Sequence, residues 1–330
     1  MIRILAPVDR VDEVDKLIDA GADEIYCGLV PSEWLHKYTA IVALTRRPAP
    51  SANLKSFKEL EECVEIAHSH NAEVSLTINE HYYRADQYDL LLKITEKAAD
   101  IGVDYIVLSD LGLLLTLRKM NIGVKLHVSI GGVALNSEAI KFYQELGVLR
   151  VQLPRDLTIE EIREICNEVS GIQLGAFILN SKCANIDGFC TFLHFPPMGP
   201  LYNNACMLSY EVFVDSNEDE EKKIVAGVRQ KVWERFHIDD RPCGACALYD
   251  FNEMNLGFVK IVGRGYPTPK KILDVTFIRT LLNYLYEKKP SREAFRLFAK
   301  SLYNRFYNRE CRVIMCYYPE VMLEWSEQHI

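Results

Sequence analysis

Half of the cysteines in this sequence fall in one segment. The 330-residue chain contains ten cysteines, and five of them lie between Cys183 and Cys246. Six residues separate Cys183 from Cys190, fifteen more separate Cys190 from Cys206, and Cys243 and Cys246 form a CxxC pair. Four thiolates that converge on one point suit zinc or an iron–sulfur cluster.

The spacing of these cysteines favours an iron–sulfur cluster, with zinc as the alternative. A structural zinc knuckle uses two tight CxxC-like pairs, whereas three of the candidates here are isolated. The opposing interpretation is a set of buried free thiols, since cysteine behaves as a small hydrophobe. Cys311 and Cys316 could also ligate a metal, together with Cys243. The remaining three are expected to be core thiols: Cys27, Cys63 and Cys166.

The overall composition is that of a folded protein. Hydrophobic residues make up 49% and charged residues 25%, which excludes a disordered chain. The formal net charge of −8 argues against a broad nucleic-acid-binding surface. It favours a small molecule or a partner protein over RNA, and an RNA substrate would require binding that depends steeply on salt.

The termini and hydropathy predict a cytoplasmic protein. No stretch approaches 18 uncharged apolar residues, so no membrane span is expected. The N-terminus reaches charge after a few apolar residues, which is too short for a signal peptide. Disulfides are rare in the cytoplasm, so clustered thiols there indicate metal binding or catalysis.

A glycine followed by a short β-rich run recurs along the chain, with helical periodicity between the copies. Gly or Asn sits where a helix C′ residue belongs, just before a strand. Helices are expected over 57–70, 88–101 and 137–146, and Thr158 with Glu161 fits a capping box. Strands are expected near 3–7, 24–28, 73–78, 104–108, 124–128, 149–153, 172–178 and 258–262.

Eight strands that alternate with helices predict a (β/α)₈ TIM-type barrel. The alternative is an open doubly wound sheet, but the count reaches eight and no GxGxxG opens any unit. Two connections are long, 29–56 and the Cys-rich insertion 179–257 after strand seven. Both follow a strand, so both lie on the face where barrel active sites are built. We assign residues 1–290 to the barrel and 291–330 to a C-terminal helical extension packed on it.

Polar residues at the ends of these strands are the candidates for catalysis. Arg155 and Arg264 directly follow apolar strands, and an acidic substrate such as a dicarboxylate would need bidentate guanidinium partners. Lys260 lies within a strand and could face the lumen. The full set of candidates is Asn79, Asp110, His127, Arg155, Lys260 and Arg264.

Two of these candidates have an equally good structural interpretation. Asp110 could cap the helix that begins LGLLLTLRK, and His127 could be a core residue. Neither GxSxG nor HExxH occurs, although a Cys–His dyad stays open because its partners meet in space.

Several stretches together resemble the U32 family, also called collagenase-like peptidases. LAPVDRVDEVDKLIDAGADEIYCG resembles the family's opening, and NLKSFKELEECVEIAHSHNAEVSLTIN a later block. SDLGLL, LHVSIGGVALNSEAIKFYQELGVLRVQLPRDLTIEEI and FVKIVGRG resemble others. The chain departs from the family where a glutamate gives way to Arg3, where KIEGR reads KIVGR, and where a His-Gly element is missing, which places it in a divergent branch.

The resemblance implies a barrel whose inserted cysteines bind a [4Fe–4S] cluster. Cys183 and Cys190 match the family's first pair, Cys206 its third cysteine, and Cys246 its fourth, with Cys243 as contender. Relatives hydroxylate aromatic rings without oxygen, in a ubiquinone precursor, a tRNA uridine or a ribosomal RNA cytidine, with prephenate as the implied oxygen donor.

The resemblance therefore implies oxygen-independent hydroxylation or a related group transfer on a small aromatic or nucleoside substrate. Two alternatives remain. One is a U32-type peptidase, whose activity would persist without the cluster and depend on one nucleophile. The other is a non-catalytic subunit that works with a second U32-family protein, since barrel proteins of this group can act in pairs.

Overall fold

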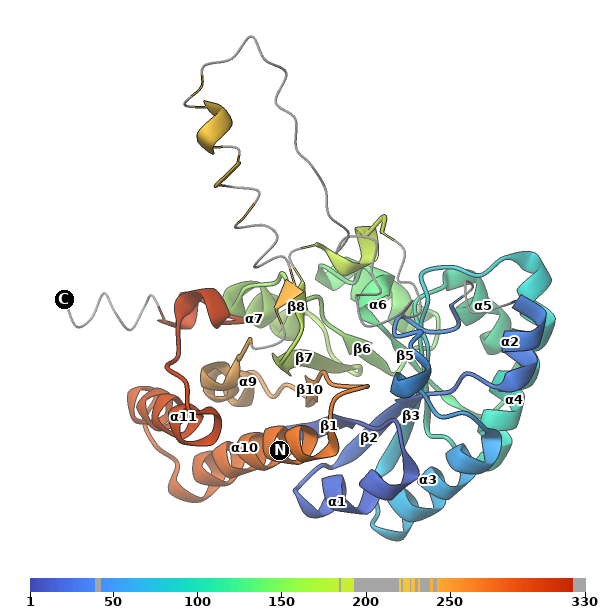
Figure 1. Cartoon of the computed structure of the whole chain (residues 1–330), viewed down its shortest axis with the longest axis horizontal. Helices are drawn as coiled ribbons and strands as arrows, with labels where there is room; N and C mark the ends of the chain where they lie inside the picture. Colours follow the sequence, from blue (N-terminus) through green and yellow to red (C-terminus); the bar gives the residue numbers. More distant parts are fainter. Residues whose placement is uncertain are drawn as a thin grey trace.

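A computed structural model describes residues 1–38, 43–183, 185–192 and 242–322, together with scattered positions between 220 and 239. Its central element is a closed barrel of eight parallel strands (Figure 1). The strands are β1 (Arg3–Pro7), β2 (Glu24–Gly28), β3 (Glu73–Ile78), β4 (Tyr105–Leu108), β5 (Lys125–Val128), β6 (Arg150–Gln152), β7 (Gln173–Leu179) and β10 (Phe258–Ile261). They pair in the order β1-β10-β7-β6-β5-β4-β3-β2.

The predicted TIM-type barrel is therefore confirmed, and each predicted strand lies within two residues of an observed one. An eight-stranded parallel sheet can close only when a helix returns the chain outside each strand. The returning helices are α1 (Val14–Asp19), α3 (Phe57–Ser69), α4 (Tyr88–Ile101), α5 (Leu111–Met120), α6 (Ser137–Glu145), α7 (Ile159–Glu168), α9 (Leu248–Glu253) and α10 (Thr268–Lys288).

Local backbone chemistry sets the ends of these helices as the sequence predicted. Thr158 and Glu161 form the capping box at the start of α7. At the end of α4, Gly102 adopts φ +99°, and Asn71 before β3 adopts φ +57°. Both angles are left-handed, which explains why Gly or Asn stands at these positions before a strand.

Within the described residues, a few elements lie outside the eight units. Helix α2 (Ser32–Tyr38) follows β2, and the two-residue strands β8 (Lys182–Cys183) and β9 (Ile238–Asp239) pair antiparallel in the insertion. Helix α11 (Arg292–Tyr307) packs on α10, where Phe277 contacts the rings of Tyr303 and Tyr307. This contact places the predicted C-terminal helix against the barrel. The division of the chain near residue 290 stays a prediction.

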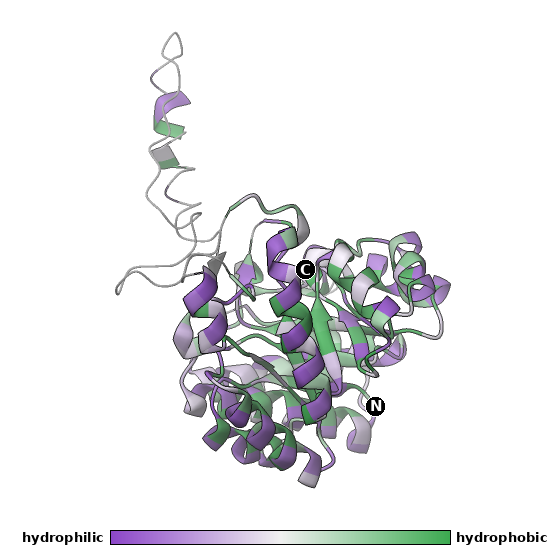
Figure 2. Ribbon diagram, turned by 90° about the vertical axis from the view of Figure 1, so that its right-hand side faces the viewer, coloured by the Kyte–Doolittle hydropathy of each residue, from purple (hydrophilic) through white to green (hydrophobic). Residues whose placement is uncertain are grey.

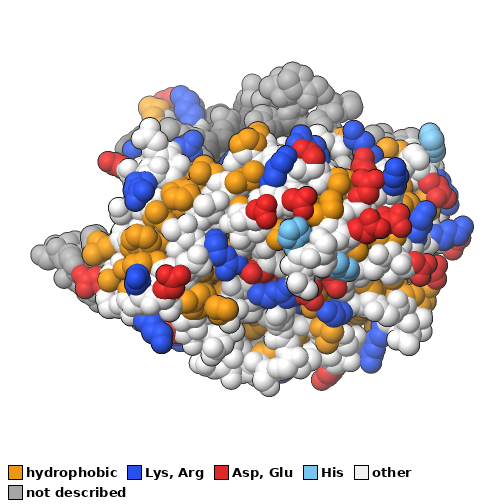
Figure 3. Space-filling model, turned by 90° about the horizontal axis from the view of Figure 1, so that it is seen from below, with side chains coloured by type: hydrophobic (Ala, Val, Ile, Leu, Met, Phe, Trp, Pro, Cys, Tyr) orange, Lys and Arg blue, Asp and Glu red, His pale blue; other side chains and the backbone are white. Residues whose placement is uncertain are grey.

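The hydrophobic core lies between the strands and the surrounding helices. Alternate strand residues such as Ile4, Val74 and Ile106 face outward and are fully buried under the helices. Figure 2 shows the apolar strands inside and the mixed polarity of the helices outside. The helical face in Figure 3 carries acidic and basic side chains interspersed with small apolar groups, as on a solvated surface. No helix in the described part of the chain has the length and apolar character to cross a membrane.

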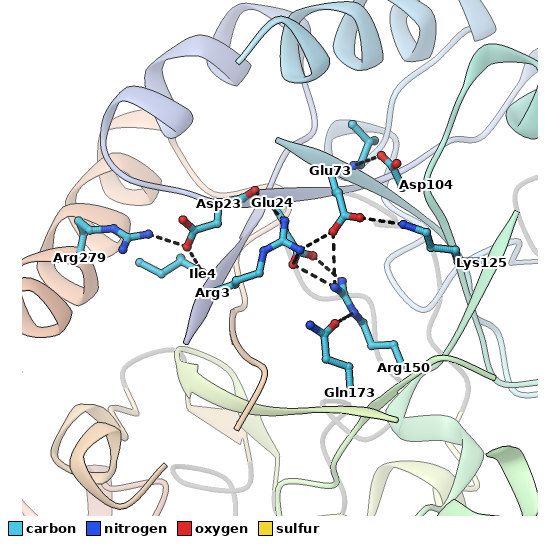
Figure 4. Close-up of polar contacts among 11 residues, drawn as sticks. Arg3, Ile4, Asp23, Glu24, Glu73, Asp104, Lys125, Arg150, Gln173 and Arg279 are labelled. Carbon is cyan, nitrogen blue, oxygen red and sulfur yellow. Dashed lines mark hydrogen bonds and ion pairs between the residues drawn. The ribbon is translucent and has the colours of Figure 1, made fainter. Parts of the chain in front are cut away.

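Charged side chains fill the amino-terminal end of the barrel lumen (Figure 4). Arg150, at the start of β6, is fully buried and donates two hydrogen bonds to Glu24, at the start of β2. Arg3 pairs with Glu24 at 2.9 Å and also with Glu73. The Arg150 guanidinium further donates to Gln173 Oε1 at 2.7 Å.

This network has a structural role. It lies at the amino-terminal end of the barrel. The active sites of such barrels are built at the opposite end, from the carboxyl ends of the strands. Every charge in it has an opposite partner, and the guanidinium of Arg150 also lies 4.0 Å from the Tyr105 ring centroid. Arg3, the departure from the family pattern, is thus explained as a third member of the Glu24 and Glu73 ion pairs.

Removing Arg150 should destabilise the barrel strongly. In an Arg150→Met variant the buried Glu24 carboxylate keeps one partly exposed partner, and breaking a buried pair costs about 3–5 kcal/mol. The matched control is Lys125→Met, whose half-exposed ammonium pairs with Glu73 and should be worth at most about 1 kcal/mol. Urea denaturation at pH 7 measures both, and equal losses would contradict a structural role for the buried pair.

Candidate functional site

The connection after β2 folds back over the carboxyl end of the barrel and binds polar side chains there. Thr45 donates to Asn79 Oδ1 at 3.0 Å, and the Arg46 backbone donates to the same oxygen. The Asn79 amide then donates to Ser129 Oγ at 3.1 Å. Asn79, predicted as catalytic, thus lies at the mouth and ties the strand ends of β3 and β5 to this connection.

Arg264 lies beside this connection with neutral hydrogen-bond partners. Its guanidinium donates to Asn53 Oδ1 at 3.0 Å and to Thr45 Oγ1 at 2.9 Å. Gly28, at the end of β2, permits this arrangement, since a Cβ there would collide with both Arg264 and Asn53. Burial lowers the pKa of Arg264 to about 10, so the group stays charged at neutral pH.

Lys260 reaches the same chamber from β10. Its ammonium lies 4.2 Å from the Tyr26 ring centroid, and the Arg264 guanidinium lies 6.0 Å from it. Burial, together with the charges of Arg264, Arg155 and Arg150, lowers the pKa of Lys260 to about 7. The prediction that Lys260 could face the lumen agrees with this placement.

His127 lies deeper in the lumen and is fully buried. Its ring contacts Phe258 edge-on at 5.5 Å between centroids, and neither ring nitrogen has a hydrogen-bond partner among the described residues. Burial lowers the pKa of His127 well below its ordinary value, so the ring is neutral. The packing supports the core interpretation, while a part in catalysis stays a prediction.

Asp110 caps helix α5, as one of its two interpretations predicted. Its carboxylate accepts from Leu113 N at 2.6 Å, from the Tyr88 hydroxyl at 2.8 Å and from Tyr83 N at 3.1 Å. These three bonds use its accepting capacity locally and fix the Tyr83 segment after β3. A direct catalytic part for Asp110 stays a prediction.

Arg155 pairs with an acid from the cysteine-rich insertion. It donates two hydrogen bonds to Asp187, at 2.9 and 2.8 Å, and a third to the Ser181 carbonyl oxygen. Its guanidinium also lies 4.9 Å from the Phe177 ring centroid. Arg155 therefore anchors the start of the insertion at the mouth, and its predicted contact with substrate stays untested.

The described cysteines of the insertion fall into two groups. Cys183 accepts hydrogen bonds from the Asn185 backbone at 3.4 Å and side chain at 3.6 Å, and it lies near Arg155 and Asp187. Cys243 accepts from Ala245 N at 3.4 Å. Such N–H···S hydrogen bonds are typical of thiolates bound in metal sites. In iron–sulfur clusters they help to set the reduction potential.

The C-terminal segment brings more thiols to the second group. Cys243 and Cys316 form a parallel β-bridge, and Cys243 N donates to Met315 O at 2.9 Å. The neighbouring thiols of Cys246, Cys316 and Cys311 add to the burial that raises the pKa of Cys243. That Cys311 and Cys316 ligate a metal together with Cys243 stays a prediction.

These groups do not by themselves make a metal centre. Within the described residues, no three or more His, Cys, Asp or Glu side chains are arranged to hold a metal ion. Cys206, a predicted ligand, lies outside the described residues. The donor chemistry of Cys183 and Cys243 fits a thiolate-bound group, and the ligand set of Cys183, Cys190, Cys206 and Cys246, with Cys243 as contender, stays a prediction.

Residue-by-residue reading of the sequence missed several groups at the mouth. Thr45, Arg47 and Asn53 come from the long connection that was expected there, but nothing singled them out within it. Arg47 donates to Ser181 Oγ at 3.0 Å. The adjacent pair Arg46–Arg47 in this connection was the available signal. Tyr317, which stacks on Phe177 at 6.4 Å, comes from the C-terminal segment.

The sequence matches the profile of peptidase family U32 over residues 9–320. The chain belongs to this family. It is 32% identical to an uncharacterized protease of Methanocaldococcus jannaschii over 201 residues, which is 58% of this chain and 43% of that protein. It is 25% identical to tRNA hydroxylation protein P of Escherichia coli over 226 residues, 67% of this chain and 46% of that protein.

A third relative is a collagenase of Porphyromonas gingivalis, 29% identical over 197 residues that make up 57% of this chain and 44% of that protein. The matched part of this U32 chain thus spans less than half the length of these relatives. Their names include both peptidases and a hydroxylation protein, so family membership alone does not select a reaction.

Lys260 should make the stability of the protein depend on pH. Below about pH 7 the ammonium is charged in the folded and unfolded chain, whereas between 7 and 10.5 only the unfolded chain binds this proton. The free energy of unfolding should therefore rise with pH across that window, by about 1.4 kcal/mol per unit of pKa difference. Denaturant titrations of the wild type and Lys260→Met, which should lack this rise, measure the effect.

The control for this pH dependence is Lys58→Met, since the Lys58 side chain is 83% exposed. This variant should keep the wild-type slope. The same slope in Lys260→Met would show that Lys260 titrates as an ordinary exposed lysine.

Proposed function

We propose that this chain is an iron–sulfur enzyme that carries out oxygen-independent hydroxylation, or a related group transfer, on a small aromatic or nucleoside substrate. The oxygen donor would be an anion of the prephenate type bound at the barrel mouth. The E. coli relative is named as a tRNA hydroxylation protein, which supports this class of reaction. The acidic net charge of −8 favours a small substrate over bulk RNA.

The observation that carries the proposal is a group of cations without acidic partners. Among the described residues, Arg47, Lys260 and Arg264 have no carboxylate within ion-pair distance, although Lys260 and Arg264 are buried. Buried charges normally have a partner of opposite sign, as the charges at the other end of the barrel do. A dicarboxylate ligand would supply the missing negative charge, and a guanidinium binds a carboxylate through two parallel hydrogen bonds.

The insertion would hold a [4Fe–4S] cluster through Cys183, Cys190, Cys206 and Cys246, with Cys243 as contender. Bound there, the cluster would supply electron transfer or a Lewis acid. The protein's own residues have separate tasks. Asp187 and Arg155 fix the insertion at the mouth, and Asn79 fixes the connection that carries Arg47 and Thr45. The buried Tyr26 and Phe258 rings keep water from the lumen below Lys260.

A peptidase is the second candidate because two relatives carry such names. A cysteine nucleophile needs a thiol whose pKa is lowered and a histidine within hydrogen-bond reach. Burial instead raises the pKa of the thiols of Cys27, Cys63, Cys166, Cys183, Cys243, Cys246, Cys311 and Cys316. No hydrogen bond joins a Cys or Ser to a His within the described residues, which favours the hydroxylase proposal.

Anaerobic purification with iron and sulfide analysis and EPR tests the cluster. Cys→Ala variants at 183, 190, 206, 243 and 246 should lose iron where they remove a ligand, and Cys63→Ala, a core thiol, should keep it. Asp187→Asn should lower iron retention, because it leaves Arg155 without its acid and loosens the insertion. Full iron retention in every insertion variant would contradict the proposed cluster.

Arg264→Gln should weaken binding of prephenate about 10- to 100-fold, the value of one charge-assisted hydrogen bond or two. Arg118→Gln, an exposed arginine in the last turn of α5, is the control and should bind like the wild type. Isothermal calorimetry under anaerobic conditions gives the affinities. Unchanged affinity in both Arg264→Gln and Arg155→Gln would remove the anion-binding role.

A further inference from the structure

Lys260 differs in its surroundings from Lys271, which is also buried, and from the half-buried Lys182. Lys271 pairs with Asp9 at 2.6 Å and with Glu13 at 2.7 Å. Lys182 donates to the carbonyl oxygens of Cys316 and Tyr317, at 3.2 and 3.0 Å. The Lys260 amine has no hydrogen-bond acceptor within the described residues, and its nearest described contact is the face of the Tyr26 ring.

The position of Lys260 also gives it access to a ligand. Lys260 is 6% exposed and is the third of the four residues of β10, below the carboxyl end of the barrel where substrates bind. The Tyr26 hydroxyl donates to the Ile261 carbonyl oxygen at 3.0 Å, so the ring is fixed beneath the amine. Two side-chain oxygens, Ser75 Oγ beside Tyr26 in the sheet and Gln152 Oε1, are also buried without partners among the described residues.

We propose that Lys260 is a covalent catalyst whose amine condenses with the carbonyl group of an α-keto acid. The inference rests on the proposed function, because a prephenate-type donor carries both a carboxylate and a keto acid group. Arg264 would bind the carboxylate, since it lies over the same Tyr26 ring as Lys260. Burial, together with the neighbouring positive charges, lowers the pKa of Lys260 and keeps part of the amine unprotonated at neutral pH.

The step needs no oxidant or reductant. The lone pair of the amine attacks the carbonyl carbon, and a C–N bond forms while the carbonyl oxygen becomes a hydroxyl group. That hydroxyl takes up a proton and leaves as water, which gives a protonated C=N bond. The resulting cation draws electrons from a neighbouring C–C or C–H bond and so weakens it. Arg264 holds the carboxylate in place during these changes.

Reductive trapping tests the inference. The anaerobically purified protein is incubated at pH 7 with phenylpyruvate and cyanoborohydride, and the labelled lysines are identified by peptide mass spectrometry. Lys260 should be labelled at least about tenfold faster than any other lysine, because an ordinary lysine has on the order of 0.1% free amine at this pH. Lys260→Arg should abolish this label. Lys58→Arg, which changes a lysine whose side chain is 83% exposed, should leave it unchanged.

A phenyllactate control, which has the carboxylate but no carbonyl group, should give no label at any site. Calorimetry of phenylpyruvate binding separates the two proposals. Binding without preferential labelling of Lys260 would overturn the covalent role and leave the anion site standing. Absence of binding would overturn both. Labelling of Lys260 in a protein that contains no iron would support the covalent role and reject the proposed cluster enzyme.

Discussion

The buried ion pair between Glu24 and Arg150 closes one end of the barrel. Residues that face the lumen of a closed barrel are cut off from water, so a charge placed there needs a partner from another strand. At the amino-terminal end this demand is met within the protein, because Arg3, Glu24, Glu73 and Arg150 begin four strands and therefore lie at one level. The balance of charge at that end stabilises the barrel, and it leaves no unpaired charge that a ligand could bind.

The opposite end of the lumen is unbalanced. Lys260 and Arg264 have neutral or aromatic neighbours, and the acids near the mouth are occupied elsewhere. Asp187 pairs with Arg155, and Asp9 pairs with Lys271. Because the same lumen satisfies every charge at its other end, the unbalanced charge at the mouth is best explained by a ligand that brings its own negative charge. Burial and the positive charges gathered at this end together lower the pKa of Lys260.

The sequence predicted the barrel and the level of each strand end because both depend on local signals. Hydrophobic strands and the helices that follow or precede them recur eight times, left-handed Gly or Asn precedes most of the strands, and Lys260 and Arg264 could be placed from these signals. The partner of Arg155 could not be placed, because Asp187 lies in an insertion whose path depends on contacts far apart in the sequence. The same reason hid Thr45, Asn53 and Tyr317, which meet the mouth through loops of irregular backbone. Asp110 had two interpretations from sequence, and the bond from Leu113 N confirms that it caps α5.

The insertion and the anion site share their supports. Ser181, two residues before Cys183, accepts a hydrogen bond from Arg47 through its hydroxyl and from Arg155 through its carbonyl oxygen. Lys182 binds the carbonyl oxygens of Cys316 and Tyr317, so the C-terminal segment holds the same strand β8. A shift of the insertion therefore moves Arg47, one of the three cations without an acidic partner. Because the residues that would carry the cluster and those that would bind the anion rest on one set of hydrogen bonds, loss of either should disturb the other.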